Sequence, residues 1–486
     1  MWSGKFGQES IEKVSFKKAF FKNIMALGGY NYSSQIANFL SSIILSRLLL
    51  PEEYGYVALI VVFTGFVTIF SDAGLSFAVI RSDYGRTFQK AVSNLAFYIG
   101  MLLFLTMILL AYPIAFFYGD NTLVLPTVVL SVTFIVGALK IVPMAIILKN
   151  LDFNYVGKVR LISNLISIFF MIVFAFLGFS YWSLIIPQIF LHIIQYYLFE
   201  HKVKLGFKFY KFYYTVIAFR KTKSLITNLS GFNLINYWAR NADNLIIGKY
   251  YSSYDLGIYN RAYKMLRLSL NLITGLFGTV LYPSLKKFKS EGGKINPEYE
   301  SILGIISLIN FPISATLILI PELFVRVLWG ENWIMVADLL PYFGILIMFQ
   351  TLTSTTGHIY ILLEKEKTMM YLGIVSAFFL VLAIVIGSFY SVMFIAIAYT
   401  SCFLVILVPI NLYIGFIKTF GFSWSYIMKF WVPKITLGIL IFISVLMEKE
   451  IWLVGLMIIF LIHLLYYQRN EIIKLIEFLY SKIVKK

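Results

Sequence analysis

The segment IMALGGYNYSSQIANFLSSIILSRLLLPEEYGYV (24–57) aligns without gaps to ITNLSGFNLINYWARNADNLIIGKYYSSYDLGIY (226–259) at a shift of 202 residues. Seven of the 34 aligned pairs are identical, and they include Gly29 with Gly231 and Gly55 with Gly257. Such self-similarity predicts an internal repeat, in which two halves of the chain adopt related folds. Each half begins with the repeated segment.

The composition places both halves in a membrane. Of 486 residues, 60% are hydrophobic and 13% are charged, against about 25% charged in soluble domains. The apolar runs are long and continuous, whereas a membrane barrel needs short alternating segments. The sequence therefore predicts an all-α membrane protein and excludes a water-soluble enzyme. Its single cysteine, Cys402, excludes an internal disulfide or a cysteine-based metal cluster.

A span needs about 20 mainly apolar residues. Fourteen such runs are expected, at 23–47, 54–80, 91–112, 122–147, 156–177, 180–200, 224–248, 256–283, 300–320, 333–361, 368–387, 391–417, 428–447 and 451–467.

The distribution of Lys and Arg predicts the orientation of these spans. With the N-terminus inside, cytosolic segments carry 31 of these residues and outer segments carry four, as the positive-inside rule requires. Both termini are therefore expected in the cytosol. A net charge of +18 is explained by this asymmetry, so no nucleic-acid partner is predicted.

The predicted spans divide the chain into two parallel six-helix lobes followed by two further helices. Both repeats start in the cytosol, which relates them by an axis along the membrane normal. All outer loops are short. The expected parts are a cytosolic amphipathic lead-in (1–22), an N-lobe (23–200), a basic cytosolic linker (201–223), a C-lobe (224–417), and helices 13–14 with a basic cytosolic tail (418–486).

Polar residues recur at equivalent positions of the first and seventh predicted helices. At about 100° per residue they fall within one arc of roughly 120° on each helix. Such a stripe is costly against lipid, so it faces a wet cavity or forms hydrogen bonds between helices. The cavity is the favoured alternative because the second stripe contains charges. The stripes comprise Asn31, Ser34, Gln35, Asn38, Ser41 and Ser42, and Asn233, Asn236, Tyr237, Arg240, Asp243 and Asn244.

Four cations descend from the predicted outer boundary toward the midplane: Arg240 on the seventh helix, and Arg261, Lys264 and Arg267 on the eighth. Each buried cation costs at least about 2.5 kcal/mol, which a bound anion would offset. The alternative is that Arg261 and Lys264 extend to the surface while Arg240 pairs with Asp243. That alternative leaves Arg267 unexplained, so an anion site is expected.

Other intramembrane ionisable residues give weaker indications. Asp72 is the candidate carboxylate for proton or cation coupling in the first half, with helix packing as an equal alternative, and Asp243 is a second candidate for coupling or ion pairing. Lys140 and Lys434 are expected to extend toward the cytosolic surface.

Sequence motifs for enzyme chemistry are missing. No GxxxxGK[ST], HExxH or GxSxG pattern occurs. No catalytic residue, cofactor or metal ligand is therefore assigned. A membrane glycan polymerase would be expected to have a long outer loop, and this sequence has none.

Several motifs resemble those of the polysaccharide transporter family, the Wzx-type oligosaccharide flippases of the multidrug/oligosaccharidyl-lipid/polysaccharide exporter superfamily. The strongest similarity lies between residues 23 and 290. The motifs are LSRLLLPEEYG (45–55), FSDAGLSFAVIR (70–81), LKNLDFNY (148–155), NADNLIIGKYYSSYDLGIYNRAYK (241–264) and LYPSL (281–285).

The resemblance implies fourteen helices in two lobes around a central cavity. It also implies export of undecaprenyl-pyrophosphate-linked oligosaccharide across a bacterial cytoplasmic membrane, for capsule, exopolysaccharide or O-antigen assembly, in a lipid environment and alongside polysaccharide polymerase or assembly proteins. Pyrophosphate binding is expected at Arg240, Arg261 and Lys264, to which the ladder adds Arg267. Sugar contacts are expected from the amide stripes and from Tyr237, Trp238, Tyr259 and Tyr263.

Two rival functions remain open. A drug or small-molecule exporter of the same superfamily would be expected to have an acidic cavity, whereas this one is predicted to be basic. A non-transporting membrane scaffold for glycan assembly would need no cavity.

Overall fold

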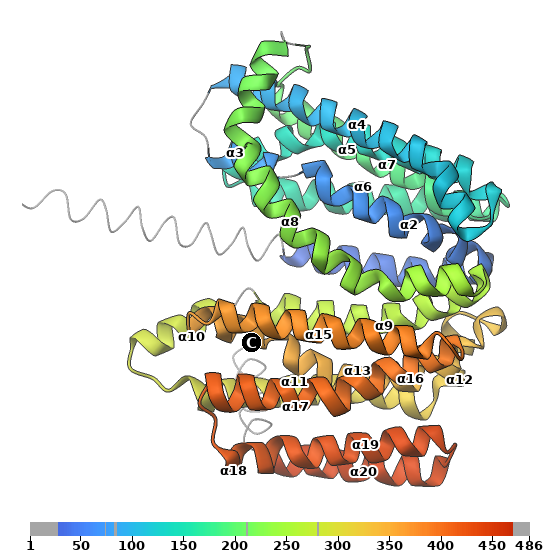
Figure 1. Ribbon diagram of the computed structural model, residues 1–486, viewed down its shortest axis with the longest axis vertical. Helices are drawn as coiled ribbons and strands as arrows, with labels where there is room; N and C mark the ends of the chain where they lie inside the picture. The colour runs from blue at the N-terminus through green and yellow to red at the C-terminus, as the bar shows by residue number, and fades with distance from the viewer. Residues whose placement is uncertain (1–27, 73, 82–84, 210–211, 279–280, 470–486) are drawn as a thin grey trace, which may run out of the picture. The chain divides into compact units, whose positions relative to one another are not determined.

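The computed structural model describes residues 28–72, 74–81, 85–209, 212–278 and 281–469. Throughout these residues the secondary structure is helical and contains no strand (Figure 1), which confirms the predicted all-α class. The chain forms two compact units, Met1–Gly257 and Ile258–Lys486.

The first element described in unit 1 is a helix over residues 28–48. Proline opens the next helix at its first position, where the missing N–H costs nothing, and the Glu53 carboxylate accepts the Leu50 N–H at 2.7 Å. The elements are α2 (Pro51–Asp72), α3 (Leu75–Arg81), α4 (Arg86–Tyr118), η1 (Asn121–Leu123), α5 (Val124–Lys149), α6 (Phe153–Phe176), α7 (Trp182–Val203), α8 (Phe212–Tyr250) and the first turn of α9 (Ser253–Gly278).

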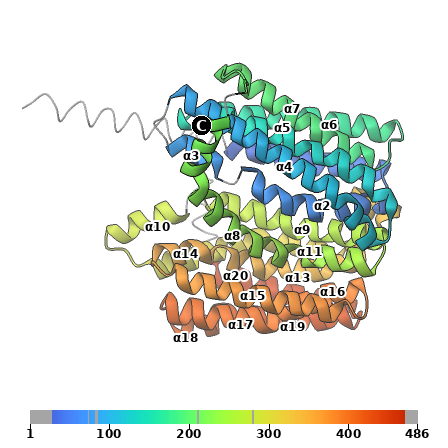
Figure 2. The ribbon, with the colours of Figure 1, turned by 45° about the horizontal axis from the view of Figure 1, so that its top comes forward.

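The centre of unit 1 is α5, which packs against α4 and α7 (Figures 1 and 2). Small residues allow the close approach of α4 and α5. A Cβ atom on Gly100 would lie 2.7 Å from both the Ala138 Cβ and the Phe134 carbonyl oxygen. Lipid provides no hydrophobic driving force for helix association, so close contacts between small residues are a common basis of helix packing within membranes.

The two repeats meet at equivalent residues inside unit 1. The first turn of α2 crosses the first turn of α9. A Cβ on Gly55 would overlap the Ser253 carbonyl oxygen, and a Cβ on Gly257 would overlap the Pro51 carbonyl oxygen and lie 3.2 Å from the Gly55 nitrogen. Because each position maps onto its counterpart at the shift of 202 residues, this contact is internally symmetric.

Unit 2 contains the rest of α9. In it α11 packs on α13, and α19 lies beside α20 (Figure 1). Three π-helical stretches, η3, η4 and η5, lie within the helices near the C-terminal end of the described residues. The elements are α10 (Leu281–Ser290), α11 (Ile295–Leu319), α12 (Pro321–Leu328), η2 (Glu331–Trp333), α13 (Val336–Ser354), α14 (Thr356–Leu362), α15 (Glu366–Gly387), α16 (Val392–Cys402), η3 (Phe403–Leu407), α17 (Val408–Ile410), η4 (Asn411–Thr419), α18 (Trp424–Tyr426), η5 (Ile427–Trp431), α19 (Val432–Leu446) and α20 (Glu450–Tyr467).

Among the described residues, eleven helical stretches are long and apolar enough to cross a membrane. The chain is therefore a multi-pass membrane protein. Three predicted spans are not among the eleven: the helix at 28–48, α8 and α9. The first predicted span starts at residue 23, which lies outside the described residues. By contrast, α8 and α9 contain the polar and charged residues of the predicted stripe and ladder, which lower their hydropathy.

One predicted boundary differs from the observed helix. The seventh span is expected from residue 224, after a linker at 201–223, but α8 begins at Phe212. A helix can extend beyond the apolar layer into the cytosol, where its basic residues are solvated, so charge alone does not mark its start. The division into lobes remains a prediction.

Candidate functional site

The polar stripe of the first helix has exposed side chains along one part and buried side chains along another. Asn31 and Asn38 are exposed, and Ser34 and Gln35 are half-buried. The Asn38 Oδ1 accepts a hydrogen bond from the Nδ2 of Asn164 on α6 at 3.2 Å. The predicted stripe thus gains a residue that sequence reasoning missed, although an amide within an apolar span is itself a signal.

The C-terminal part of this stripe, Ser41 and Ser42, forms its hydrogen bonds within its own helix. Ser41 and Ser42 are buried. Their hydroxyls donate to the Asn38 and Phe39 carbonyl oxygens at 2.9 and 2.7 Å, so they need no ligand.

On α8, the aromatic part of the stripe packs against α2. The Tyr237 hydroxyl donates to the Val62 carbonyl oxygen at 2.6 Å. The Tyr237 and Trp238 rings lie 6.0 and 5.0 Å from the Phe66 ring. Gly65 makes room for this contact, since a Cβ there would lie 2.5 Å from the Tyr237 hydroxyl oxygen. In this conformation, Tyr237 helps to hold α8 on α2.

Further along α8, the charged residues of the predicted stripe differ in how far they are buried. Arg240 is exposed, whereas Asp243 and Asn244 are 2% and 7% exposed. The Asp243 Oδ1 accepts the Asn244 backbone N–H at 2.8 Å. The side chains of Asn233 and Asn236 lie outside the described residues.

In unit 2, Arg261 is a buried cation rather than an open one. It is 3% exposed, and its guanidinium carbon lies 4.2 Å from the Trp333 ring centroid and 5.4 Å from that of Trp329. Stacking on aromatic faces stabilises a desolvated guanidinium by about 2 kcal/mol or more. The two indoles therefore offset part of the cost of burying this cation, and the bound anion remains a prediction.

Lys264 and Arg267 follow Arg261 at intervals of three residues on α9 and are less buried than it is. Lys264 is exposed and Arg267 is half-buried, and the Arg267 guanidinium carbon lies 4.9 Å from the Tyr263 ring centroid. Tyr263 in turn stacks on Tyr259 with 6.0 Å between ring centroids. This packing orients Arg267 while Lys264 stays open.

Two asparagines that sequence reasoning missed complete this face. Asn260 precedes Lys264 by four residues and Arg267 by seven, and Asn271 follows Lys264 by seven residues and Arg267 by four. All four residues therefore fall within about 60° of one another on an ideal helix. Asn260 is half-buried and Asn271 is exposed. We call Asn260, Lys264, Arg267 and Asn271 the polar face of α9. Their spacing of i, i+4, i+7 and i+11 is the sequence signal that could have identified this face.

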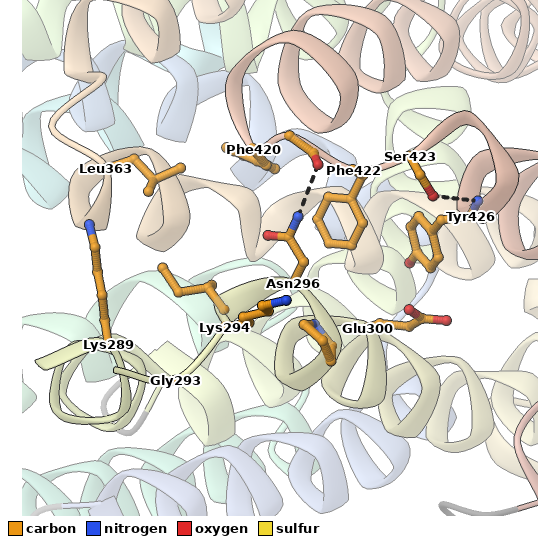
Figure 3. A pocket seen from close by; sticks show the side chains of 13 residues that line it. Lys289, Gly293, Lys294, Asn296, Glu300, Leu363, Phe420, Phe422, Ser423 and Tyr426 are labelled. Atoms are coloured by element: carbon orange, nitrogen blue, oxygen red, sulfur yellow. Dashed lines mark hydrogen bonds between the residues drawn. The ribbon is translucent and has the colours of Figure 1, made fainter. Parts of the chain in front are cut away.

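A cavity of about 540 Å³ lies elsewhere in unit 2, beside the start of α11 (Figure 3). Lys289, Lys294 and Glu300 line it together with the turn after Phe420. The Asn296 Nδ2 donates to the Gly421 carbonyl oxygen across it at 3.2 Å. None of the predicted site residues lines this cavity.

Asp72 has a structural explanation. Its Oδ1 accepts the Ser76 backbone N–H at 2.9 Å and its Oδ2 accepts the Ser76 hydroxyl at 2.6 Å. Asp72 is the last residue of α2, and its carboxylate satisfies one of the backbone N–H groups in the first turn of α3 that have no partner within the helix. A coupling role remains a prediction.

The expectation that Lys140 and Lys434 extend to the cytosolic surface is wrong. Lys434 is 1% exposed, with its Nζ 3.3 Å from the Phe430 ring centroid and 3.3 Å from the Phe430 carbonyl oxygen. Lys140 donates to side chains of α7 instead. Both amines find partners near the level of their own backbone.

Comparison with solved structures identifies the class of fold. The chain has a TM-score of 0.67 to the lipid II flippase MurJ in an inward closed conformation, at 16% identity, covering 93% of this chain and 100% of that one. An inward-facing MATE family multidrug resistance transporter of the MOP superfamily gives 0.60 at 14% identity, covering 82% and 96%. The fold is therefore that of MurJ and MATE transporters.

Within that fold class the sequence identifies the family. Residues 44–338 match the family described as "Polysaccharide biosynthesis protein", and the chain belongs to that family. This confirms the resemblance seen in the sequence motifs.

Curated relatives agree with the family. TuaB of Bacillus subtilis (strain 168), a teichuronic acid biosynthesis protein, is 24% identical over 313 residues, covering 63% of this chain and 62% of that protein. The lipopolysaccharide biosynthesis protein WzxC of Escherichia coli (strain K12) is 22% identical over 401 residues, covering 80% of each. The chain thus spans less than two thirds of TuaB.

Proposed function

We propose that this protein exports undecaprenyl-pyrophosphate-linked oligosaccharide units across the bacterial cytoplasmic membrane by alternating access. The polar face of α9 is the observation on which the proposal rests. Two cations and two amides share one side of a helix in a chain with a flippase-type fold, and Lys264 and Asn271 are exposed.

The chemistry of this face suits a pyrophosphate bearing sugars. Ammonium and guanidinium groups form charge-assisted hydrogen bonds to phosphate oxygens, and such bonds are about twice as strong as neutral ones. Amides both donate to and accept from sugar hydroxyls. In this proposal Lys264 and Arg267 bind the pyrophosphate, and Asn260 and Asn271 bind adjacent polar groups. The buried positive charge of Arg261, stacked on Trp329 and Trp333, attracts the pyrophosphate without touching it. Arg240 provides a further exposed cation on α8.

The membrane topology follows from the same proposal. The eleven apolar stretches, the helix at 28–48, α8 and α9 together make fourteen spans, with both termini in the cytosol by the positive-inside rule. The polyprenyl tail stays in lipid while the repeats rock against each other. The protein performs transport rather than catalysis, and polysaccharide polymerase or assembly proteins take up its product.

The test removes both cations of the polar face. Each charged hydrogen bond contributes about 1.5–3 kcal/mol, so Lys264→Gln with Arg267→Gln is expected to weaken binding of the lipid-linked oligosaccharide by about 10² to 10⁴. Export in a complementation assay should fall accordingly. Arg326→Gln is the matched control, because Arg326 pairs with Glu322 at 3.7 Å on an exposed segment.

Thermal unfolding in detergent separates a binding defect from a folding defect. The double variant is expected to unfold close to the wild-type temperature. Full export by a correctly folded double variant would refute the assignment of the polar face, and the drug-exporter and scaffold functions would then be tested instead.

A further inference from the structure

Unit 1 contains an ionisable pair that the proposed function does not use. Lys140 on α5 donates a hydrogen bond to the Gln195 Oε1 at 2.5 Å, and its Nζ lies 2.8 Å from the His192 Nδ1. Both partners are on α7, which packs along α5 (Figures 1 and 2). Gln195 is 8% exposed, so it is a fixed partner.

The pair lies within the membrane layer. Lys140 is nine residues from the end of the stretch Asn121–Lys149, which is 29 residues long, and this places its backbone about 13 Å from that end. His192 lies at a similar level, about 16 Å from the end of α7 at Val203. An ionised lysine at such depth is expensive, and intramembrane ionisable groups usually serve a function.

The charges around Lys140 do not neutralise it. Arg160 on α6 repels it electrostatically; the Arg160 Nη2 lies 3.6 Å from the Met144 sulfur of α5. The helices α2, α3 and α4 also pack against α5, but among the described residues the charged group that acts on Lys140 is Arg160. No described carboxylate forms a salt bridge with Lys140. Asp72, for example, is bonded to Ser76.

Hydrogen-bond chemistry limits the pair to one excess proton. The His192 Nδ1 accepts from the Lys140 ammonium only while the imidazole is neutral. If both groups were charged, two donors and two positive charges would face each other at 2.8 Å in a medium of low dielectric. If Lys140 is neutral, its lone pair can accept the imidazole N–H. The pair therefore holds a net charge of either +1 or 0.

We propose that Lys140 and His192 form a proton-binding site, positioned by Gln195, whose loading couples transport to the proton gradient. This inference rests on the proposed transport function. Binding of a proton adds a full charge between α5 and α7. A conformation that admits water to the pair favours the charged form, and a conformation that closes it favours the neutral form. Proton occupancy thereby shifts the conformational equilibrium.

The experiment uses the full-length protein in liposomes that contain the pH indicator pyranine, with a fluorescent undecaprenyl-pyrophosphate-linked oligosaccharide as substrate. Substrate distribution across the bilayer is measured with and without a gradient of one pH unit. For one proton exchanged per substrate, that gradient changes the distribution ratio about tenfold. The wild-type protein is expected to show this change together with a matching pyranine signal.

Three variants test the pair. Lys140→Arg fixes the charge, Lys140→Met removes it, and His192→Asn keeps a hydrogen-bonding group that does not titrate. Each is expected to lose both the tenfold response and the pyranine signal. Lys434→Arg is the control, since Lys434 is another buried lysine near Glu300 in unit 2, and it is expected to respond as the wild type does.

The outcomes separate the two proposals. A normal gradient response in any one of the three variants would overturn the proton site. Wild-type export that ignores the gradient would also overturn it, while leaving the export function intact. Failure of the wild-type protein to move the substrate at all would refute the proposed function itself.

Discussion

The symmetric glycine contact between α2 and α9 predicts a strong conformational effect of Gly55→Ala. The added Cβ would overlap the Ser253 carbonyl oxygen and lie 2.9 Å from the Gly257 nitrogen. These are backbone atoms of a helical turn, which cannot rotate away as a side chain can. Overpacking of this kind costs about 1–3 kcal/mol, which corresponds to a roughly 5- to 150-fold shift between two conformations.

If transport requires the repeats to separate at this crossing, the substitution should favour the separated state. Spin labels at Glu52 and Ser252, both exposed in this structure, would report the distance between the two first turns on a Cys402→Ser background. Gly55→Ala is expected to raise the ratio of long to short distances roughly 5- to 150-fold. Export should fall, since one conformation becomes hard to reach.

Gly137→Ala is the matched control, because a methyl group added to this helical glycine of α5 would meet no atom within 4 Å. It should leave the distance distribution unchanged. An unchanged distribution in Gly55→Ala, or an equal shift in Gly137→Ala, would refute the idea that this crossing separates during transport.

Three further predictions concern single residues. Arg261→Ala should lower the thermal stability of the purified protein by the equivalent of about 2 kcal/mol, the value of a desolvated cation–π contact; a melting temperature equal to that of the wild type would show that Trp329 and Trp333 do not hold it. Asp72→Asn should retain export, because the asparagine side-chain oxygen can accept the same Ser76 N–H, whereas Asp72→Ala should cost about 1 kcal/mol in an unfolding titration through loss of this hydrogen bond; abolished export in a stable Asp72→Asn protein would support a coupling carboxylate instead. Tyr237→Phe should destabilise the protein by about 0.5–1.5 kcal/mol through loss of its hydrogen bond to the Val62 carbonyl oxygen, and a calorimetric trace that matches the wild type would contradict that role.

Much of the fold was predictable because membrane spans leave a strong local signal. Continuous apolar runs placed α5 and α6 within a few residues. The shift of 202 residues predicted an internal repeat, but it did not predict that Gly55 and Gly257 would lie at the same contact. The start of α8 was less predictable, since a basic segment in water can be helical or irregular.

Side-chain partners distant in sequence were the unpredictable part. Arg261 stacks on Trp329 and Trp333, and Lys140 reaches His192; in each case the partners lie on separate elements far apart along the chain. A helical wheel gives the direction of a side chain but not the chemistry of the helix opposite. Asn260 and Asn271 were missed for another reason, because the prediction for α9 rested on its charges and not on its full polar periodicity.

The central claim is that the protein moves lipid-linked oligosaccharide between leaflets. The most direct measurement is the leaflet distribution of undecaprenyl-pyrophosphate-linked oligosaccharide in a deletion strain, with and without the restored gene. Accumulation on the cytosolic side that the wild-type chain clears, and that the Lys264→Gln/Arg267→Gln chain does not, is the predicted result. No accumulation in a strain that makes the glycan and has no second transporter would contradict the account.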